Sequence, residues 1–172
     1  FVEAGSAEEA NLRAFYNDLS KDQVARLGWM PKAGESDEDI QMRPYILSAS
    51  LYGKNEASEK QAHEIYVEYQ DKLASLSADI RAYVLINEVE NYGSSDLTDK
   101  LVALYQATSD PSFKMDLEAA IVKSKDEKEL KKIISWFENA EIVKPQDLRG
   151  WFRGVLSNAK GEQLAWDWIR DE

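Results

Sequence analysis

The sequence contains no cysteine, which excludes disulfide bridges, a thiol nucleophile and any cysteine-ligated metal. A chain without cysteine suits a reducing compartment, so we expect a cytoplasmic protein. Long apolar runs are also missing, because no stretch approaches the roughly 20 consecutive apolar residues that a membrane-spanning helix requires. We therefore expect no membrane partner.

Positive charge is scarce, since 21 Lys and Arg residues stand against 32 Asp and Glu residues and give a net charge of −11. The densest basic stretch, Lys123 to Lys132, is interleaved with acids and is typical of a solvated helix face with ion pairs one turn apart. A nucleic-acid-binding protein needs a basic patch or stripe. We therefore exclude nucleic acid as a partner.

A single histidine, His63, limits the chemistry available to this chain. The segment His63–Val67 (HEIYV) begins like the zinc-peptidase motif H-E-x-x-H, but valine occupies the position of the second histidine. Two histidines four residues apart are needed to direct both imidazoles at one metal. A Ser–His–Asp arrangement would also need His63, and neither a nucleophile elbow nor a glycine-rich phosphate loop occurs. We predict no catalytic residue, no metal ligand and no cofactor in this chain.

Only four prolines and eight glycines interrupt the chain, and no stretch alternates polar and apolar residues as a strand would. Capping residues and helix breakers predict about nine helices. Their expected extents or starts are 6–27, 36–53, 55–73, 77–93, Ser95, Asp110–Pro111, the capping box Ser124–Glu127, Pro145 and Gly161.

Alternate helices are expected to begin near residues 78, 111 and 145, in steps of 33 and 34 residues. Two short helices in about 34 residues indicate an array of helical hairpins. The tetratricopeptide signature does not recur. The pattern therefore predicts an all-α fold, a curved superhelical stack of antiparallel helix pairs like HEAT or armadillo repeats, forming one helical domain over residues 1–172.

Apolar residues at helical spacing predict the buried faces. The first helix is expected to bury a face with Leu12, Phe15, Tyr16 and Leu19. Two short helices joined by a turn at Ser157–Gly161 close the chain, with Trp166 and Trp168 on different faces. The residues expected to be buried in this pair are Leu148, Trp151, Phe152, Val155, Leu156, Leu164, Ala165, Trp168 and Ile169.

Two arginines are the candidate site residues. Arg43 precedes Pro44 in the second predicted helix, and Arg81 lies in the first turn of the fourth. A guanidinium near a helix N-terminus opposes the helix dipole unless a carboxylate accompanies it. Arg81 is therefore either a structural clamp or a group that binds an anion on a concave face, and the sequence leaves both open.

Several short motifs carry a resemblance to a known family. They are Leu27–Trp29 (LGW), Arg43–Gly53 (RPYILSASLYG) followed by Ala62 and Tyr66, Ala78–Val84 (ADIRAYV), Leu104–Tyr105, Gln146–Asp147 and Asn158–Arg170 (NAKGEQLAWDWIR). In this order and spacing, residues from about 12 to 172 resemble the C-terminal helical domain of M1-family zinc aminopeptidases. Within that family the chain looks most like bacterial aminopeptidase N, whose C-terminal domain is similar to that of the endoplasmic-reticulum aminopeptidases.

The resemblance implies a non-catalytic domain that covers the catalytic domain of a zinc aminopeptidase and limits or guides peptide access. Zinc and the catalytic motifs then belong to a preceding domain of the parent chain, and this fragment alone is inactive. The implied partners are the catalytic and N-terminal domains of the same chain and peptide substrates. Arg43 and Arg81 become substrate-path candidates. A start at Phe1 and an uncapped end at Glu172 agree with an excerpt from a longer enzyme.

The residues alone leave a second class of function open. A free-standing α-solenoid that binds a protein partner, with no connection to peptidases, would show the same helical pattern. An upstream zinc-peptidase motif in the same reading frame would favour the aminopeptidase, whereas an initiator methionine just before Phe1 would favour the scaffold.

Overall fold

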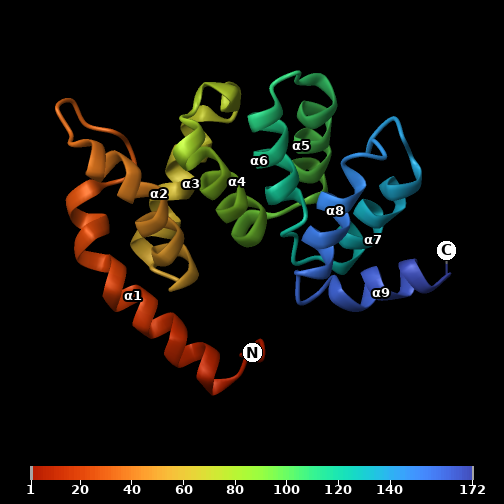
Figure 1. The fold of residues 1–172 in the computed structure, drawn as a ribbon, viewed down its shortest axis with the longest axis horizontal. Coiled ribbons are helices and arrows are strands. Elements are labelled where there is room, and N and C mark those ends of the chain that lie inside the picture. Colours follow the sequence, from red (N-terminus) through yellow and green to blue (C-terminus); the bar gives the residue numbers. More distant parts are fainter. Residues whose placement is uncertain (1, 172) are drawn as a thin grey trace. The chain divides into compact units, whose positions relative to one another are not determined.

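The computed structural model describes residues 2–171, and every regular element in that range is a helix (Figure 1). No helix in this range is long and apolar enough to cross a bilayer. The all-α fold class is thus confirmed. The elements are α1 (Ala7–Leu27), α2 (Asp37–Tyr52), α3 (Glu56–Tyr69), the 3₁₀ helix η1 (Leu73–Ser75), α4 (Ala78–Tyr92), α5 (Ser95–Ala107), α6 (Pro111–Ile121), α7 (Glu127–Ser135), the 3₁₀ helix η2 (Trp136–Glu138), α8 (Leu148–Leu156) and α9 (Glu162–Asp171).

Four helix starts follow the predicted capping chemistry. The side chains of Ser6, Ser36, Asn55 and Asp110 each accept a hydrogen bond from a backbone amide in the following turn. These bonds satisfy amides that have no partner inside the helix. Helix α1 ends at Leu27 and is capped by Gly28, whose positive φ of 67° is a conformation that glycine adopts without strain.

Two predicted limits in the middle of the chain are wrong by a few residues. Helix α3 ends at Tyr69 rather than near Leu73, which begins the separate helix η1. Helix α5 is capped by Ser94 rather than Ser95, because the Ser94 side chain accepts the hydrogen bond from the amide of Leu97.

Two later starts are also displaced. Asp126 caps α7 in place of Ser124, whose hydroxyl instead accepts a hydrogen bond from the Asp126 amide in the turn before the helix. Helix α8 begins at Leu148 and not at Pro145, because residues 144–147 form a turn in which the Asp147 amide donates to the carbonyl oxygen of Lys144.

The chain divides into two compact units, residues 1–84 and 85–172, and the division falls inside α4. In the first unit α1 and α2 are antiparallel. Arg26 near the end of α1 pairs with Asp39 at the start of α2 at 2.7 Å. Arg13, nearer the start of α1, donates to the carbonyl oxygen of Tyr52 at the end of α2 at 2.8 Å. These contacts fix the predicted helix pair.

The second unit is a stack of helix pairs, in which α5 with α6 and α8 with α9 are joined by short turns and pack together (Figure 1). Helices α6 and α8 run parallel, because Glu118 lies against Gly150 and Val122 lies against Gly154 one turn later. Both contacts join residues 32 positions apart, close to the predicted repeat. The starts of α4, α6 and α8 are separated by 33 and 37 residues rather than 33 and 34, since α8 begins late.

Aromatic residues fill the core of the second unit. Trp151 of α8 is fully buried, and its ring meets those of Tyr105 and Trp136 edge to face at centroid distances of 5.2 and 6.1 Å. Trp168 of α9 packs against Phe137 at 5.3 Å. The last two helices therefore contribute to a packed core, as predicted from their tryptophans.

Three apolar residues that were predicted to be buried are exposed. Phe15 and Leu19 show 60% and 59% of their surface, because α1 turns the neighbouring face with Tyr16 toward α2. Ile169 near the chain end is also exposed. Trp166 faces solvent, in agreement with its predicted separation from Trp168.

Candidate functional site

Arg43, a predicted substrate-path residue, is buried in the first unit with 2% of its surface exposed. Its Nε donates to the carbonyl oxygen of Gly28 at 3.2 Å, and its guanidinium pairs with the Glu35 carboxylate. Burial raises the pKa of Glu35, but a backbone hydrogen bond at Lys32 and the Arg43 guanidinium outweigh it and hold that pKa below its ordinary value. The ionised pair fixes the loop between α1 and α2.

Arg81, the second candidate, has 3% of its surface exposed. Its Nη1 donates to the carbonyl oxygen of Ala74 at 3.2 Å and lies 3.5 Å from that of Leu76. Arg81 thus holds η1 and the following loop against the first turn of α4. Both arginines bind backbone of their own unit, and the substrate-path role of each stays a prediction.

The side chains that the structure describes do not suit a zinc site. His63 lies half-buried on α3. Within residues 2–171 no group of three or more His, Asp or Glu side chains is placed to hold a metal ion. Three protein ligands and an open position are what a catalytic zinc requires. The zinc that the family resemblance implies therefore does not fit these residues.

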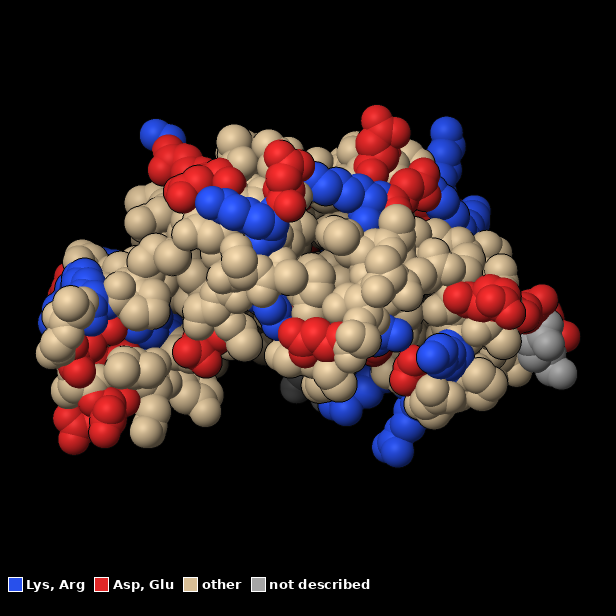
Figure 2. Space-filling model, turned by 90° about the horizontal axis from the view of Figure 1, so that it is seen from above, with Lys and Arg blue, Asp and Glu red and all other residues tan. Residues whose placement is uncertain are grey.

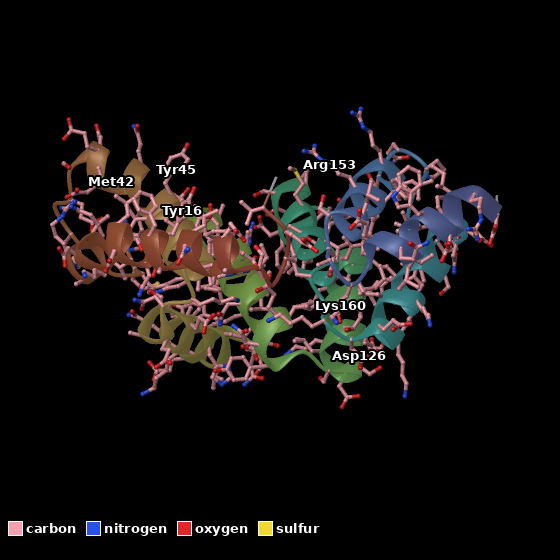
Figure 3. The ribbon with its side chains drawn as sticks, turned by 90° about the horizontal axis from the view of Figure 1, so that it is seen from below. Tyr16, Met42, Tyr45, Asp126, Arg153 and Lys160 are labelled. Atoms are coloured by element: carbon pink, nitrogen blue, oxygen red, sulfur yellow. The ribbon has the colours of Figure 1, made fainter. Side chains whose placement is uncertain are left out.

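An aromatic hollow of about 320 Å³ opens between α1, α2 and α4 of the first unit. Figure 3 shows Tyr16, Met42 and Tyr45 on one side of this unit. Tyr45 is the most exposed of its large apolar residues, at 76%. The residues that line the hollow are Leu12, Tyr16, Tyr45, Ser48, Ala49, Tyr52 and Tyr83.

The tyrosines give this hollow apolar walls with a few hydroxyl groups. Burial raises the pKa of Tyr83, while a hydrogen bond with Ser48 acts in the opposite direction, so the phenol is neutral at physiological pH. The ring of Tyr16 meets that of Tyr52 edge to face at 5.0 Å, and the Arg13 guanidinium lies 4.9 Å from the Tyr52 ring centroid. Such a surface suits an apolar or amphipathic side chain.

A hydrogen-bonded network links α5 and α8 in the second unit, beside α6. The indole Nε1 of Trp151 donates to the Tyr105 hydroxyl at 3.3 Å, and that hydroxyl donates to Asp147 Oδ2 at 3.0 Å. Burial raises the pKa of Tyr105 to about 12. On α6, burial and then the nearby Asp147 carboxylate raise the pKa of Glu118 to about 7. The site therefore contains a carboxyl group that titrates near neutrality.

A polar hollow of about 520 Å³ adjoins this network. Asp147 reaches it from the turn before α8, and Lys114 reaches it from α6 with its Nζ 5.1 Å from the Tyr105 ring centroid. The complete lining is Gln106, Ala107, Thr108, Ser109, Pro111, Lys114, Lys144, Gln146 and Asp147.

Neither hollow was predicted from the sequence. Their linings come from separate helices, and no spacing rule joins positions so far apart in the chain. The available signal was indirect, since Leu104–Tyr105 and Gln146–Asp147 both belong to the motifs that carry the family resemblance. Tyr45, Tyr52 and Tyr83 of the first hollow also lie within those motifs, whereas Tyr16 does not.

Comparison with known proteins supplies the family. Residues 2–172 match the family described as the ERAP1-like C-terminal domain. The chain is 86% identical over 172 residues to an aminopeptidase N of Lactobacillus delbrueckii subsp. lactis and 59% identical over 172 residues to that of Lactobacillus helveticus. It is also 38% identical over 169 residues, 98% of the chain, to an aminopeptidase N of Lactococcus lactis subsp. cremoris.

In each of these three comparisons the chain covers 20% of the relative. It therefore spans about a fifth of the length of the proteins it matches. A free-standing scaffold with no peptidase connection is not supported by these matches. The match over nearly the whole chain agrees with the observed all-helical fold, and the chain belongs to the family of ERAP1-like C-terminal domains found in aminopeptidase N.

Proposed function

We propose that this chain is the non-catalytic C-terminal domain of a zinc-dependent M1 aminopeptidase, a hydrolase that removes N-terminal residues from peptides. The observation that carries the proposal is the family match over residues 2–172, together with relatives named aminopeptidase N. Because the chain spans about a fifth of those relatives, the zinc site and the catalytic residues are assigned to the remaining part of a cytoplasmic parent enzyme.

The proposed role is to cover the catalytic domain and to limit or guide the entry of peptides. Its partners are then the catalytic and N-terminal domains of its own chain and the peptide substrates. Exposed large apolar residues around the aromatic hollow, Phe15, Leu19 and Tyr45, support a contact surface, because grouped apolar side chains on a soluble protein mark binding faces. Arg43 and Arg81 would serve the substrate path indirectly, by fixing the loops that they bind.

The test compares the full-length parent with the isolated chain of residues 1–172. We expect the parent to hydrolyse alanyl-p-nitroanilide, to lose this activity on treatment with a zinc chelator and to regain it with added zinc. The isolated chain should show no hydrolysis with zinc present, since residues 2–171 place no group of three or more His, Asp or Glu side chains to hold a metal ion. Activity of the isolated chain, or an inactive zinc-loaded parent, would contradict the proposal.

A further inference from the structure

Arg149 and Arg153 on α8 differ from the other arginines of this chain. Both are exposed, and neither forms a hydrogen bond or an ion pair with any residue in the described range 2–171. The remaining arginines are all engaged by carboxylates or carbonyl oxygens of their own unit, namely Arg13, Arg26, Arg43, Arg81 and Arg170. The two guanidiniums without a partner in this range therefore lie on the same helix, one turn apart.

The packing of α8 explains why both point outward. Trp151 and Val155 are fully buried in the core of the second unit. Residues two positions apart on an α-helix lie about 200° apart around its axis. Arg149 and Arg153 consequently lie on the side opposite to these two residues, and Figure 3 shows Arg153 extending away from the helix ribbon. Gly150, between them in sequence, faces α6 instead.

Helix α6 continues the same outer face with an apolar residue. Met115 is 70% exposed and lies two positions before Leu117, which is fully buried. By the same geometry Met115 lies opposite the core. Since α6 and α8 are parallel and in contact, the outer face combines Met115 with the two guanidiniums. We call this surface the arginine face.

Charge makes the arginine face unusual in this chain. With 32 acidic against 21 basic residues, carboxylates are abundant, and on the side drawn in Figure 2 red and blue groups adjoin in several places. Two like charges one turn apart on a helix repel by a few tenths of a kcal/mol. A carboxylate pair removes that repulsion and binds guanidinium groups through charge-assisted hydrogen bonds. Any carboxylate that pairs with Arg149 or Arg153 therefore lies outside the described residues 2–171.

We propose that the arginine face receives an acidic segment of the parent chain, so that Arg149 and Arg153 form ion pairs between this domain and the rest of the enzyme. The proposal rests on the proposed function, because about four-fifths of the length of the relatives lies outside this chain. One turn of helix separates the guanidinium stems by about 6 Å. Carboxylates at i and i+4 of a helix, or at i and i+2 of an extended segment, match this spacing. Met115 adds an apolar contact at the edge of the ion pairs.

The test is zero-length crosslinking of the full-length parent carrying R149K and R153K. Lysine keeps the positive charge but offers an amine, which a water-soluble carbodiimide joins to a carboxylate only where the two are in contact. Peptide mass spectrometry then identifies the carboxylate. Two pairs within the chain calibrate the reaction, Lys131 with Glu127 at 2.6 Å and Lys132 with Asp99 at 2.5 Å.

We expect the substituted positions 149 and 153 to link to an Asp or Glu outside residues 1–172 of the same molecule, with a yield within a factor of about three of the internal pairs. The yield should fall in 1 M salt, where screening acts over about 3 Å. Three results would each overturn the proposal. The substituted residues could link only to carboxylates within residues 1–172, or only to a second copy or to added peptide. They could also form no link although Lys131 reacts.

The activity of the same sample separates this inference from the proposed function. A variant that hydrolyses alanyl-p-nitroanilide like the wild type but gives no outside link refutes the arginine face alone. If the parent has no peptidase activity but still forms the outside link, the ion pairs are confirmed and the peptidase assignment is refuted.

Discussion

The half-buried carboxyl group of Glu118 should make the stability of the second unit depend on pH. Its pKa is raised from 4.5 to about 7, first by burial and then by the Asp147 carboxylate. A change of one unit in a pKa corresponds to about 1.4 kcal/mol. The rise from 4.5 to about 7 therefore lowers the free energy of unfolding by about 3 kcal/mol once the pH is well above 7. We expect about 2 kcal/mol between pH 5 and pH 8, because part of the change precedes pH 5 and residual contact with water screens the charge.

The direction follows from the raised pKa. Below pH 4.5 the carboxyl is protonated in both the folded and the unfolded state, so it carries no penalty. As the pH rises from 4.5 to about 7, the unfolded state releases its proton first and the free energy of unfolding falls. Glu118→Gln is neutral at every pH and avoids this loss. The stability of the variant relative to the wild type should therefore increase by about 2 kcal/mol from pH 5 to pH 8.

Urea unfolding followed by tryptophan fluorescence measures this difference. Glu162→Gln, an exposed carboxyl on α9, is the matched control and should show no such growth. Asp147→Asn should reduce the growth, because it removes the neighbouring charge. A Glu118→Gln effect that stays constant within about 0.5 kcal/mol between the two pH values would refute the reasoning. The signal reports mainly on the second unit, which holds Trp136, Trp151, Trp166 and Trp168.

Two further predictions concern the close packing of α8 against α6 and a buried hydrogen bond between α2 and α3. Gly154→Ala places a methyl group 2.6 Å from Val122 Cγ2, and we expect a loss of about 1–3 kcal/mol despite the better helix propensity of alanine. Gly150→Ala meets only the flexible end of a glutamate and should cost less, so equal melting temperatures of the two variants would contradict this account. Ser50→Ala breaks a buried 2.6 Å hydrogen bond with the Ser58 hydroxyl and should cost about 1–2 kcal/mol. The double variant with Ser58→Ala should be more stable than the sum of the single effects predicts, and a strictly additive double-mutant cycle would refute the coupling.

Helix starts could largely be predicted because capping acts within a few residues. Ser36 followed by three acids indicated the start of α2, and Gly28 indicated the end of α1. The errors arose where a turn competes with a helix. Pro145 is compatible with a first helical position. The turn at residues 144–147 nevertheless delays α8 to Leu148.

Apolar periodicity predicted that α1 has an apolar face but not which surface covers it. Phe15 and Leu19 have the spacing of a core stripe, yet both are exposed in this chain. The same spacing occurs on a face that meets another domain, so one sequence pattern serves both structures. Arg43 and Arg81 posed a similar difficulty, since a buried clamp and an anion-binding group use the same residue type.

The half-buried carboxyl of Glu118 and the arginine face depend on one contact that no local signal reveals. Gly150 and Gly154 carry no side chain, so α8 lies close enough to α6 for the Glu118 carboxyl to be covered. The same rotation of α8 buries Trp151 and directs Arg149 and Arg153 outward. A residue that tilted α8 away from α6 would therefore alter both properties together, exposing Glu118 and redirecting the guanidiniums. The close approach of α6 and α8, whose contacting residues lie 32 positions apart in the sequence, therefore determines the electrostatics of this face.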